Sequence, residues 1–181
     1  HEPTLEALES LALMAETVDI CRITTTTDTG RADGLAVPLL QRRRPIIRFA
    51  GVEVSPPPGA FLQATRKGAD AITEAVLAGV GTASRIVELH AGCGTLSFPL
   101  HQRGRVHAVE GDPAAVAALN AAAAGASLRG SFTVEVRDLT DQPLGIKELA
   151  EHEALVFDPP RAGARAQAEQ IAAGGPGRVV A

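Results

Sequence analysis

The sequence predicts an α/β protein with a mostly parallel sheet, preceded by a small α+β segment. Short apolar, β-branched runs recur through the second half of the chain, and helical or polar segments separate them. Strands that alternate with helices form right-handed crossovers, which place neighbouring strands parallel. A proline-rich stretch, Ser55-Pro56-Pro57-Pro58-Gly59, precedes these runs and predicts an extended linker. We therefore expect a small segment over residues 1–58 and the sheet domain over residues 59–181.

Composition excludes several classes of protein. The chain has 181 residues, 45% of them hydrophobic and 21% charged, which is typical of a globular protein and excludes wholesale disorder. No stretch approaches the roughly 18 apolar residues of a membrane span, and the first residues do not resemble a signal peptide. Two cysteines cannot form a disulfide framework or, alone, a zinc or iron–sulfur site, so we expect a reduced, cytoplasmic protein without a metal.

The charge and aromatic content limit the partners that the chain can bind alone. With 17 Lys+Arg against 21 Asp+Glu, the formal net charge is −4, which disfavours strong non-specific binding to phosphates. The chain has no Trp or Tyr and only 5 Phe, so it offers few platforms for stacking single-stranded bases. Nearly all the basic residues are Arg rather than Lys, and Ala and Gly are abundant. Together these features indicate a GC-rich bacterial genome.

The first part of the chain contains a helix, a strand and a hairpin. Leucines at helical spacing with acids between them predict an amphipathic helix over residues 3–16. Residues 20–24 are β-branched and predict a strand, and a polar, Thr- and Gly-rich loop follows to residue 34. Residues 45–54 predict a hairpin that turns near Ala50-Gly51.

The second part begins with a helix over residues 66–80. Four buried strands are then predicted, at residues 86–89, 106–110, 132–136 and 154–158. Asp112 as N-cap and Pro113 at the first helical position begin the helix after the second strand. A segment that contains residues 146–151 lies between the third and fourth strands, and residues 178–181 resemble the start of a fifth strand.

Glycines and acids follow the predicted strands at the positions where open α/β sheets bind ligands. Gly92 and Gly94 follow the first strand and allow a tight turn with close approach of a ligand. Glu110 ends the second strand, 22 residues after Glu88, where a carboxylate can accept hydrogen bonds from ribose hydroxyls. Asp138 follows the third strand, within reach of an adenine amino group. Each feature alone is also compatible with an ordinary loop.

Two further details favour a particular cofactor. The dinucleotide-binding pattern G-x-G-x-x-G requires a third small residue, and Ser97 fits that position poorly. Glu88, four residues before Gly92, suits a ligand with a positive amine and sulfonium, such as S-adenosylmethionine, better than NAD. Asp158 begins D-P-P-R-A-G, in which the prolines end the strand and hold the carboxylate rigidly in the cleft.

Together, ELHAGCGTLSFPL, VEGD, DPPRAGA and the upstream Phe61-Leu62-Gln63 resemble the RNA (uracil-5-)-methyltransferases, which make 5-methyluridine in transfer or ribosomal RNA. The resemblance covers residues 59–181 and implies a Rossmann-like class I core that binds S-adenosylmethionine. The hairpin before Gln63 resembles the end of the family's small central domain. The implied cofactor-binding residues are Gln63, Glu88, His90, Gly92, Gly94, Thr95, Glu110, Asp138 and Asp158.

The resemblance also implies roles for single residues. Gln63 is expected at the methionine end of the cofactor, Glu110 at the ribose, Asp138 at the adenine, and Asp158 near the cofactor and the target uracil. His90 and Thr95 are expected to line the cofactor loop. They replace an aromatic residue and an amide that are more usual in the family.

The family mechanism needs a cysteine thiolate that attacks C6 of uracil, which makes C5 nucleophilic toward the methyl group. The resemblance places this cysteine and a carboxylate base beyond Ala181, so we expect a fragment without activity of its own. Cys93 and Cys21 are interpreted as packing residues. The basic run Gln41–Arg44 contacts RNA phosphates or is a solvated loop, and Arg161 and Arg165 are the better RNA candidates.

Two alternatives remain at the level of sequence. Methyltransferases that act on amino groups of adenine or glutamine usually carry an aromatic residue after the two prolines, where this chain has Arg161. A non-catalytic or NAD-binding Rossmann module is the second alternative, because it would show the same alternation of strands and helices. The RNA substrate and the oligomeric state are not specified by the sequence.

Overall fold

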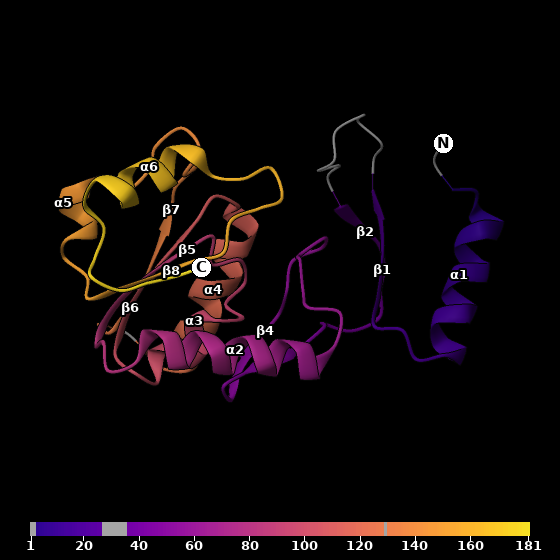
Figure 1. The fold of residues 1–181 in the computed structure, drawn as a ribbon. Coiled ribbons are helices and arrows are strands. Elements are labelled where there is room, and N and C mark those ends of the chain that lie inside the picture. Colours follow the sequence, from indigo (N-terminus) through magenta and orange to yellow (C-terminus); the bar gives the residue numbers. More distant parts are fainter. Residues whose placement is uncertain (1–2, 27–35, 129) are drawn as a thin grey trace.

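The computed structural model describes residues 3–26, 36–128 and 130–181 (Figure 1). Its centre is a parallel five-stranded sheet in the order β7-β6-β5-β8-β9. These strands are β5 (Arg85–Leu89), β6 (Arg105–Glu110), β7 (Phe132–Val136), β8 (Ala154–Phe157) and β9 (Val179–Val180). The chain runs from β5 outward to β6 and β7, and then returns to the other side of β5 as β8 and β9. The loops after β5 and β8 therefore lead in opposite directions, which opens a crevice where open α/β sheets bind ligands.

Six helices occur in the described residues: α1 (Leu5–Thr17), α2 (Arg66–Val80), α3 (Ser97–His101), α4 (Pro113–Gly125), α5 (Ile146–Leu149) and α6 (Arg165–Gly174). Three of them begin with side-chain caps, and in α1 the Thr4 hydroxyl accepts a hydrogen bond from Ala7 N. The Asp112 side chain accepts a hydrogen bond from Ala114 N, and the Thr65 hydroxyl accepts one from Gly68 N. The predicted cap of α4 is therefore confirmed, and Thr65 begins α2. Within the part of the chain that the structure describes, no helix is long and apolar enough to cross a membrane.

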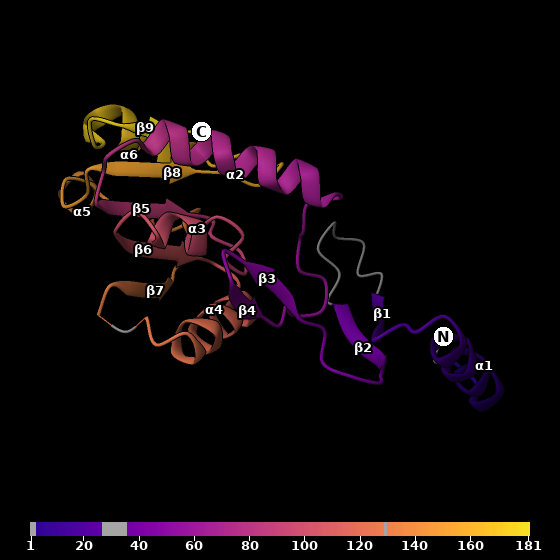
Figure 2. The same cartoon turned by 90° about the horizontal axis from the view of Figure 1, so that it is seen from below.

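The core consists of two apolar clusters, one on each face of the sheet. Alternate residues of each strand point to opposite faces, so Ile86 belongs to one cluster and Val87 to the other. The first cluster packs the sheet against α2, α3 and α4, and the second packs it against the loop before α5, α5 itself and α6. Figure 1 shows the sheet between these two helical layers, and Figure 2 views it from the side of α2, α3 and α4. This three-layer arrangement confirms the predicted α/β class.

The beginning of the chain forms two small antiparallel sheets, one made of β1 (Arg22–Thr26) with β2 (Ala36–Gln41) and one made of β3 (Ile47–Phe49) with β4 (Val52–Val54). The sequence did not predict β2. It predicted a loop from residue 24 to residue 34, of which residues 27–34 lie outside the described part. Helix α1 and the β1–β2 pair lie apart from the parallel sheet (Figure 2).

The β3–β4 hairpin turns at Ala50 and Gly51, both with positive φ, as the sequence predicted. Val54 is fully buried in the first cluster, where β4 contacts α4. The hairpin therefore shares a core with the parallel sheet although it precedes the proline-rich stretch. Arg22 donates hydrogen bonds to the Pro56 and Pro57 carbonyls and so ties that stretch to β1. A domain boundary at residue 58 stays a prediction.

Candidate cofactor site

A cavity of about 840 Å³ lies at the carboxyl edge of the parallel sheet. The loops after β5, β6 and β8 form its walls, together with residues near Gln63 and one side of α2. Seven of the nine residues expected from the sequence line it, namely Gln63, Glu88, His90, Gly92, Thr95, Glu110 and Asp158. The structure therefore brings together residues that are up to 95 positions apart in the sequence, because parallel strands end at one edge.

The loop after β5 has the sharp course that its glycines predict. Gly92 and Gly94 have φ values of +57° and +102°, and His90 between strand and loop also has a positive φ. A Cβ added to Gly94 would lie 2.4 Å from a ring carbon of Phe98, so any side chain there would displace the core. A Cβ added to Gly92 would meet nothing within 4 Å. The loop thus packs tightly on one side and leaves space on the other.

Glu110 joins the loop after β5 to the loop after β6. One carboxylate oxygen accepts a hydrogen bond from Gly92 N at 2.7 Å, and the other accepts one from Asp112 N at 2.8 Å. Each carboxylate oxygen can accept more than one hydrogen bond. Glu110 is half-buried in the cavity wall, so it holds both loops in place and keeps acceptor capacity for a ligand.

Glu88 is a buried acid within the cavity wall, with 3% of its surface exposed. Burial raises the pKa of its carboxyl to about 8, with a further contribution from nearby carboxylates and against the opposing effect of the Ser97 hydroxyl. Its Oε2 is buried and makes no hydrogen bond within the described residues. An unpartnered buried carboxyl is costly, and a cationic ligand group would compensate it.

His90 lies beside Glu88 in the same wall. Its ring packs against Phe157, with ring centroids 5.9 Å apart. Burial lowers the pKa of the imidazole, which favours the neutral form near pH 7, although nearby carboxylates oppose this effect. Its Nε2 is buried and, among the described residues, has no hydrogen-bond partner. Two polar groups of this wall therefore lack a hydrogen-bond partner in the described part of the chain.

The two remaining acids differ in position. Asp158 is exposed at the rim, where the two prolines after it end β8. Asp138 lies outside the cavity walls and is exposed at the end of β7. Its carboxylate accepts a hydrogen bond from Thr140 N at 2.8 Å, which lowers its pKa. The structure thus places Asp138 near the site, and its expected contact with adenine stays a prediction.

Comparisons with known proteins agree with this architecture. No family model matches the chain. An uncharacterized RNA methyltransferase of Rhizobium meliloti is 49% identical over 138 residues, which are 76% of this chain and 33% of the relative. A 23S rRNA (uracil(1939)-C(5))-methyltransferase of Halomonas elongata is 40% identical over 100 residues, 52% of this chain and 20% of the relative. The chain therefore matches one segment of these RNA methyltransferases. It spans about a third of the length of the first curated relatives it matches.

A solved structure supports the same fold. The Pyrococcus abyssi tRNA (uracil-54, C5)-methyltransferase, in complex with S-adenosyl-L-homocysteine, superimposes with a TM-score of 0.67 and 18% identity. The match covers 88% of this chain and 40% of that protein. The parallel sheet and its helices are therefore the Rossmann-like fold of class I methyltransferases.

The sequence alone did not identify the contribution of α2 to this cavity, which Ala69 and Ile72 line. Phe61 and Arg161 line it too, and both stand in motifs that the sequence analysis singled out. Phe61 and Ile72 are 76% and 41% exposed, and both lie in the cavity wall. Together they give a ligand apolar surface to contact, a feature that becomes visible only once the fold is known.

Other residues singled out in the sequence have structural roles. Arg43 forms an ion pair with Asp19 at 2.5 Å, and Arg42 donates to the Ala15 carbonyl, so these two arginines hold β2 against the end of α1. Cys93 is 2% exposed, and burial raises the pKa of its thiol. Cys21 is half-buried. Among residues 3–26, 36–128 and 130–181, no group of acids, histidines and cysteines could hold a metal ion.

Proposed function

We propose that this chain is the cofactor-binding core of an S-adenosylmethionine-dependent RNA methyltransferase that makes 5-methyluridine in transfer or ribosomal RNA. The observation that carries the proposal is the convergence of Glu88, Glu110 and Asp158 on one cavity beside the glycine loop. The relative from Halomonas elongata and the protein from Pyrococcus abyssi are both named as uracil-C5 methyltransferases, which supports the choice of uracil C5. Because bacterial transfer and ribosomal RNA are found in the cytoplasm, we propose that the protein acts there.

The residues of the cavity fit the chemistry of S-adenosylmethionine. Its methionine end carries an ammonium group and its sulfur is a sulfonium, and both positive charges suit a wall of carboxylates. The unpartnered Oε2 of Glu88 is the clearest sign of fit, because a cation would compensate this buried acid. When bound, the cofactor supplies an electrophilic methyl group. The chain's own residues bind and orient it.

We assign separate binding roles to the residues of the wall. Glu110 would accept hydrogen bonds from the ribose hydroxyls while it keeps its backbone donors, Gly92 and Asp112. Gln63 would contact the methionine end, and Asp158 would lie between the cofactor and the target base. Asp138 would reach the adenine from outside the cavity wall. The neutral imidazole of His90 would donate or accept one hydrogen bond through Nε2.

The nucleophile that adds to C6 of uracil is assigned to neither cysteine. Cys93 is buried inside the glycine loop, and its raised pKa disfavours the thiolate. Cys21 lies just before β1, in the part of the chain that is separate from the parallel sheet.

Calorimetric titration with S-adenosylhomocysteine tests the proposal. We expect saturable binding, no comparable binding of NADH, and protection from thermal unfolding by the first ligand only. Glu110→Ala should weaken binding by about 10- to 100-fold, the value of hydrogen bonds to a charged acceptor. Gln63→Ala provides a second variant that leaves the Glu110 hydrogen bonds intact, and Glu74→Gln on the exposed side of α2 is the control.

The absence of binding to folded protein, or equal binding by all variants, would contradict the proposal. Preferential protection by NADH would indicate a dinucleotide-binding module. Identification of the modified base by mass spectrometry, after RNA is treated with the full-length enzyme, distinguishes 5-methyluridine from a methylated amino group.

A further inference from the structure

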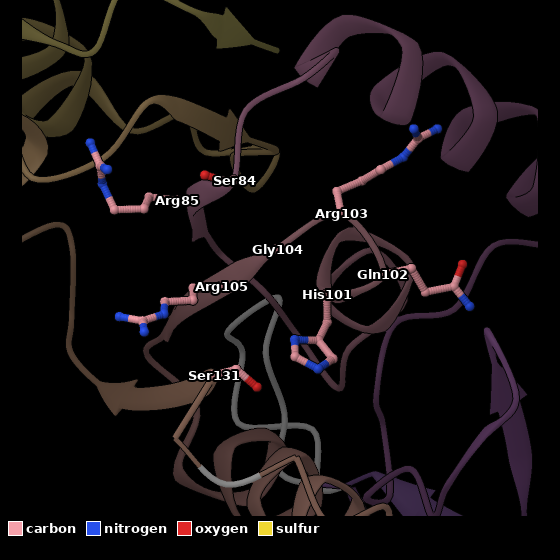
Figure 3. Close-up of a pocket in the computed structure, with 8 residues that line it drawn as sticks. All are labelled: Ser84, Arg85, His101, Gln102, Arg103, Gly104, Arg105 and Ser131. Carbon is pink, nitrogen blue, oxygen red and sulfur yellow. The ribbon is translucent and has the colours of Figure 1, made fainter.

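A second pocket, of about 620 Å³, lies at the amino edge of the parallel sheet, opposite the cofactor cavity (Figure 3). Arg85 begins β5, Arg105 begins β6, and Arg103 lies in the turn before β6. All three line this pocket, together with polar or small residues, and no acid is among its lining residues. A chain with a net charge of −4 thus concentrates positive charge at one edge.

Backbone contacts fix the shape of this pocket. Arg105 N donates to the Ser84 carbonyl at 2.8 Å, and Val106 N donates to the Ser131 carbonyl at 3.0 Å. A Cβ added to Gly104 would lie 2.2 Å from the Ser84 carbonyl oxygen, so the backbones touch at the floor of the pocket. The backbone of Gly104 and Arg105 is therefore held in place by the sheet, and Figure 3 shows the Arg103 and Arg105 side chains on opposite sides of Gly104.

The arginines differ in their partners. Arg85 forms an ion pair with Glu153 at 3.0 Å. Within the described ranges of the chain, Arg103 and Arg105 form no ion pair. Arg85 and Arg105 are partners in the register of β5 and β6, and like charges at neighbouring strand positions repel each other. An anion between them would relieve this repulsion.

His101 adds an independent observation. Its ring lines the pocket and packs edge-on against Phe132, with centroids 5.8 Å apart. Its Nδ1 is buried and has no partner among the residues that the structure describes. Figure 3 shows the ring on the same side of Gly104 as Ser131. The pocket thus offers two guanidinium groups that form no ion pair among the described residues, beside an imidazole whose Nδ1 is buried.

We propose that this pocket binds the backbone phosphates of the RNA substrate, through Arg103 and Arg105. The choice of RNA as the source of phosphate rests on the proposed methyltransferase function. Acids dominate the polar walls of the cofactor cavity and disfavour phosphates there, whereas the amino edge attracts them. Strand β6 joins the two sites, since it begins at Arg105 and ends at Glu110. At about 3.3 Å per residue it spans roughly 20 Å, so one folded RNA can contact both edges.

Fluorescence anisotropy with a labelled, unmodified transfer RNA transcript, measured at several salt concentrations, tests this proposal. We expect the double variant Arg103→Ala with Arg105→Ala to lose affinity by roughly tenfold. The slope of log affinity against log salt should decrease in magnitude by about 1 for each lost phosphate contact. The matched control is Lys67→Ala with Lys147→Ala, which removes the same charge at exposed positions elsewhere.

Several outcomes would overturn the proposal. Unchanged affinity and slope in the double variant would do so, as would an equal loss in the control. Inorganic phosphate that protects the pocket while RNA affinity stays unchanged would indicate a small-anion site instead. Calorimetry with S-adenosylhomocysteine on the same double variant should be unaffected. A failure of the cofactor proposal is therefore distinguishable from a failure of this one.

Discussion

The pH dependence of stability gives a direct test of the buried acid in the cofactor cavity. Glu88 has a pKa of about 8 in the folded protein against an ordinary value of 4.5, because burial disfavours its charged form. The folded state therefore binds a proton that the unfolded state releases over this range. Stability falls as pH rises from about 4.5 toward 8 and is constant above that value with respect to this group.

The magnitude follows from the same values. Between about pH 6 and about pH 8, the wild-type chain should lose about 2 kcal/mol of unfolding free energy relative to Glu88→Gln, whose amide stays neutral. Urea denaturation of both proteins at the two pH values measures this difference, and other titrating groups cancel in the comparison. Glu74→Gln, which removes an exposed acid, is the matched control and should follow the wild-type profile. Parallel profiles for wild type and Glu88→Gln would refute the reasoning.

Two further predictions concern the glycine loop and the cysteines. Gly94→Ala should destabilise the fold by about 2–4 kcal/mol, since its Cβ would meet Phe98 at a positive φ, whereas Gly92→Ala should cost only about 1–2 kcal/mol of backbone strain. Thermal or urea unfolding measures both, and equal losses would contradict the packing described for this loop. Iodoacetamide should alkylate Cys21 faster than Cys93, because Cys93 is buried and its thiol pKa is raised. Mass spectrometry gives the order of alkylation. Faster alkylation of Cys93 would contradict its burial.

The parallel sheet could be predicted from the sequence because its strands are apolar runs bounded by clear signals. The Asp112-Pro113 cap and the Ala50-Gly51 turn are local features, and the structure forms both. Strand β2 was missed because Pro38 interrupts its run and its residues are only partly buried. Helix α6 carries few apolar residues, so its periodicity was too weak to predict it.

The candidate site could be predicted only in part, because residue type does not specify side-chain direction. Glu110 and Asp158 reach the cavity as expected, whereas Asp138 turns its carboxylate to Thr140 N. The contribution of α2 through Ile72 depends on tertiary packing and has no motif. The basic run near Arg43 suggested RNA contact as one possibility, but Asp19, which lies far from it in the sequence, binds that arginine.

The account depends on the carboxyl edge of the sheet as the binding surface for a sulfonium nucleoside. Backbone amide chemical shifts, followed during titration with S-adenosylhomocysteine, test this directly. We predict saturable changes at Gly92, Thr95 and Glu110, which line the cavity, and little change at Arg105 at the amino edge. Unchanged amides along the cavity, or changes confined to the amino edge, would contradict the account.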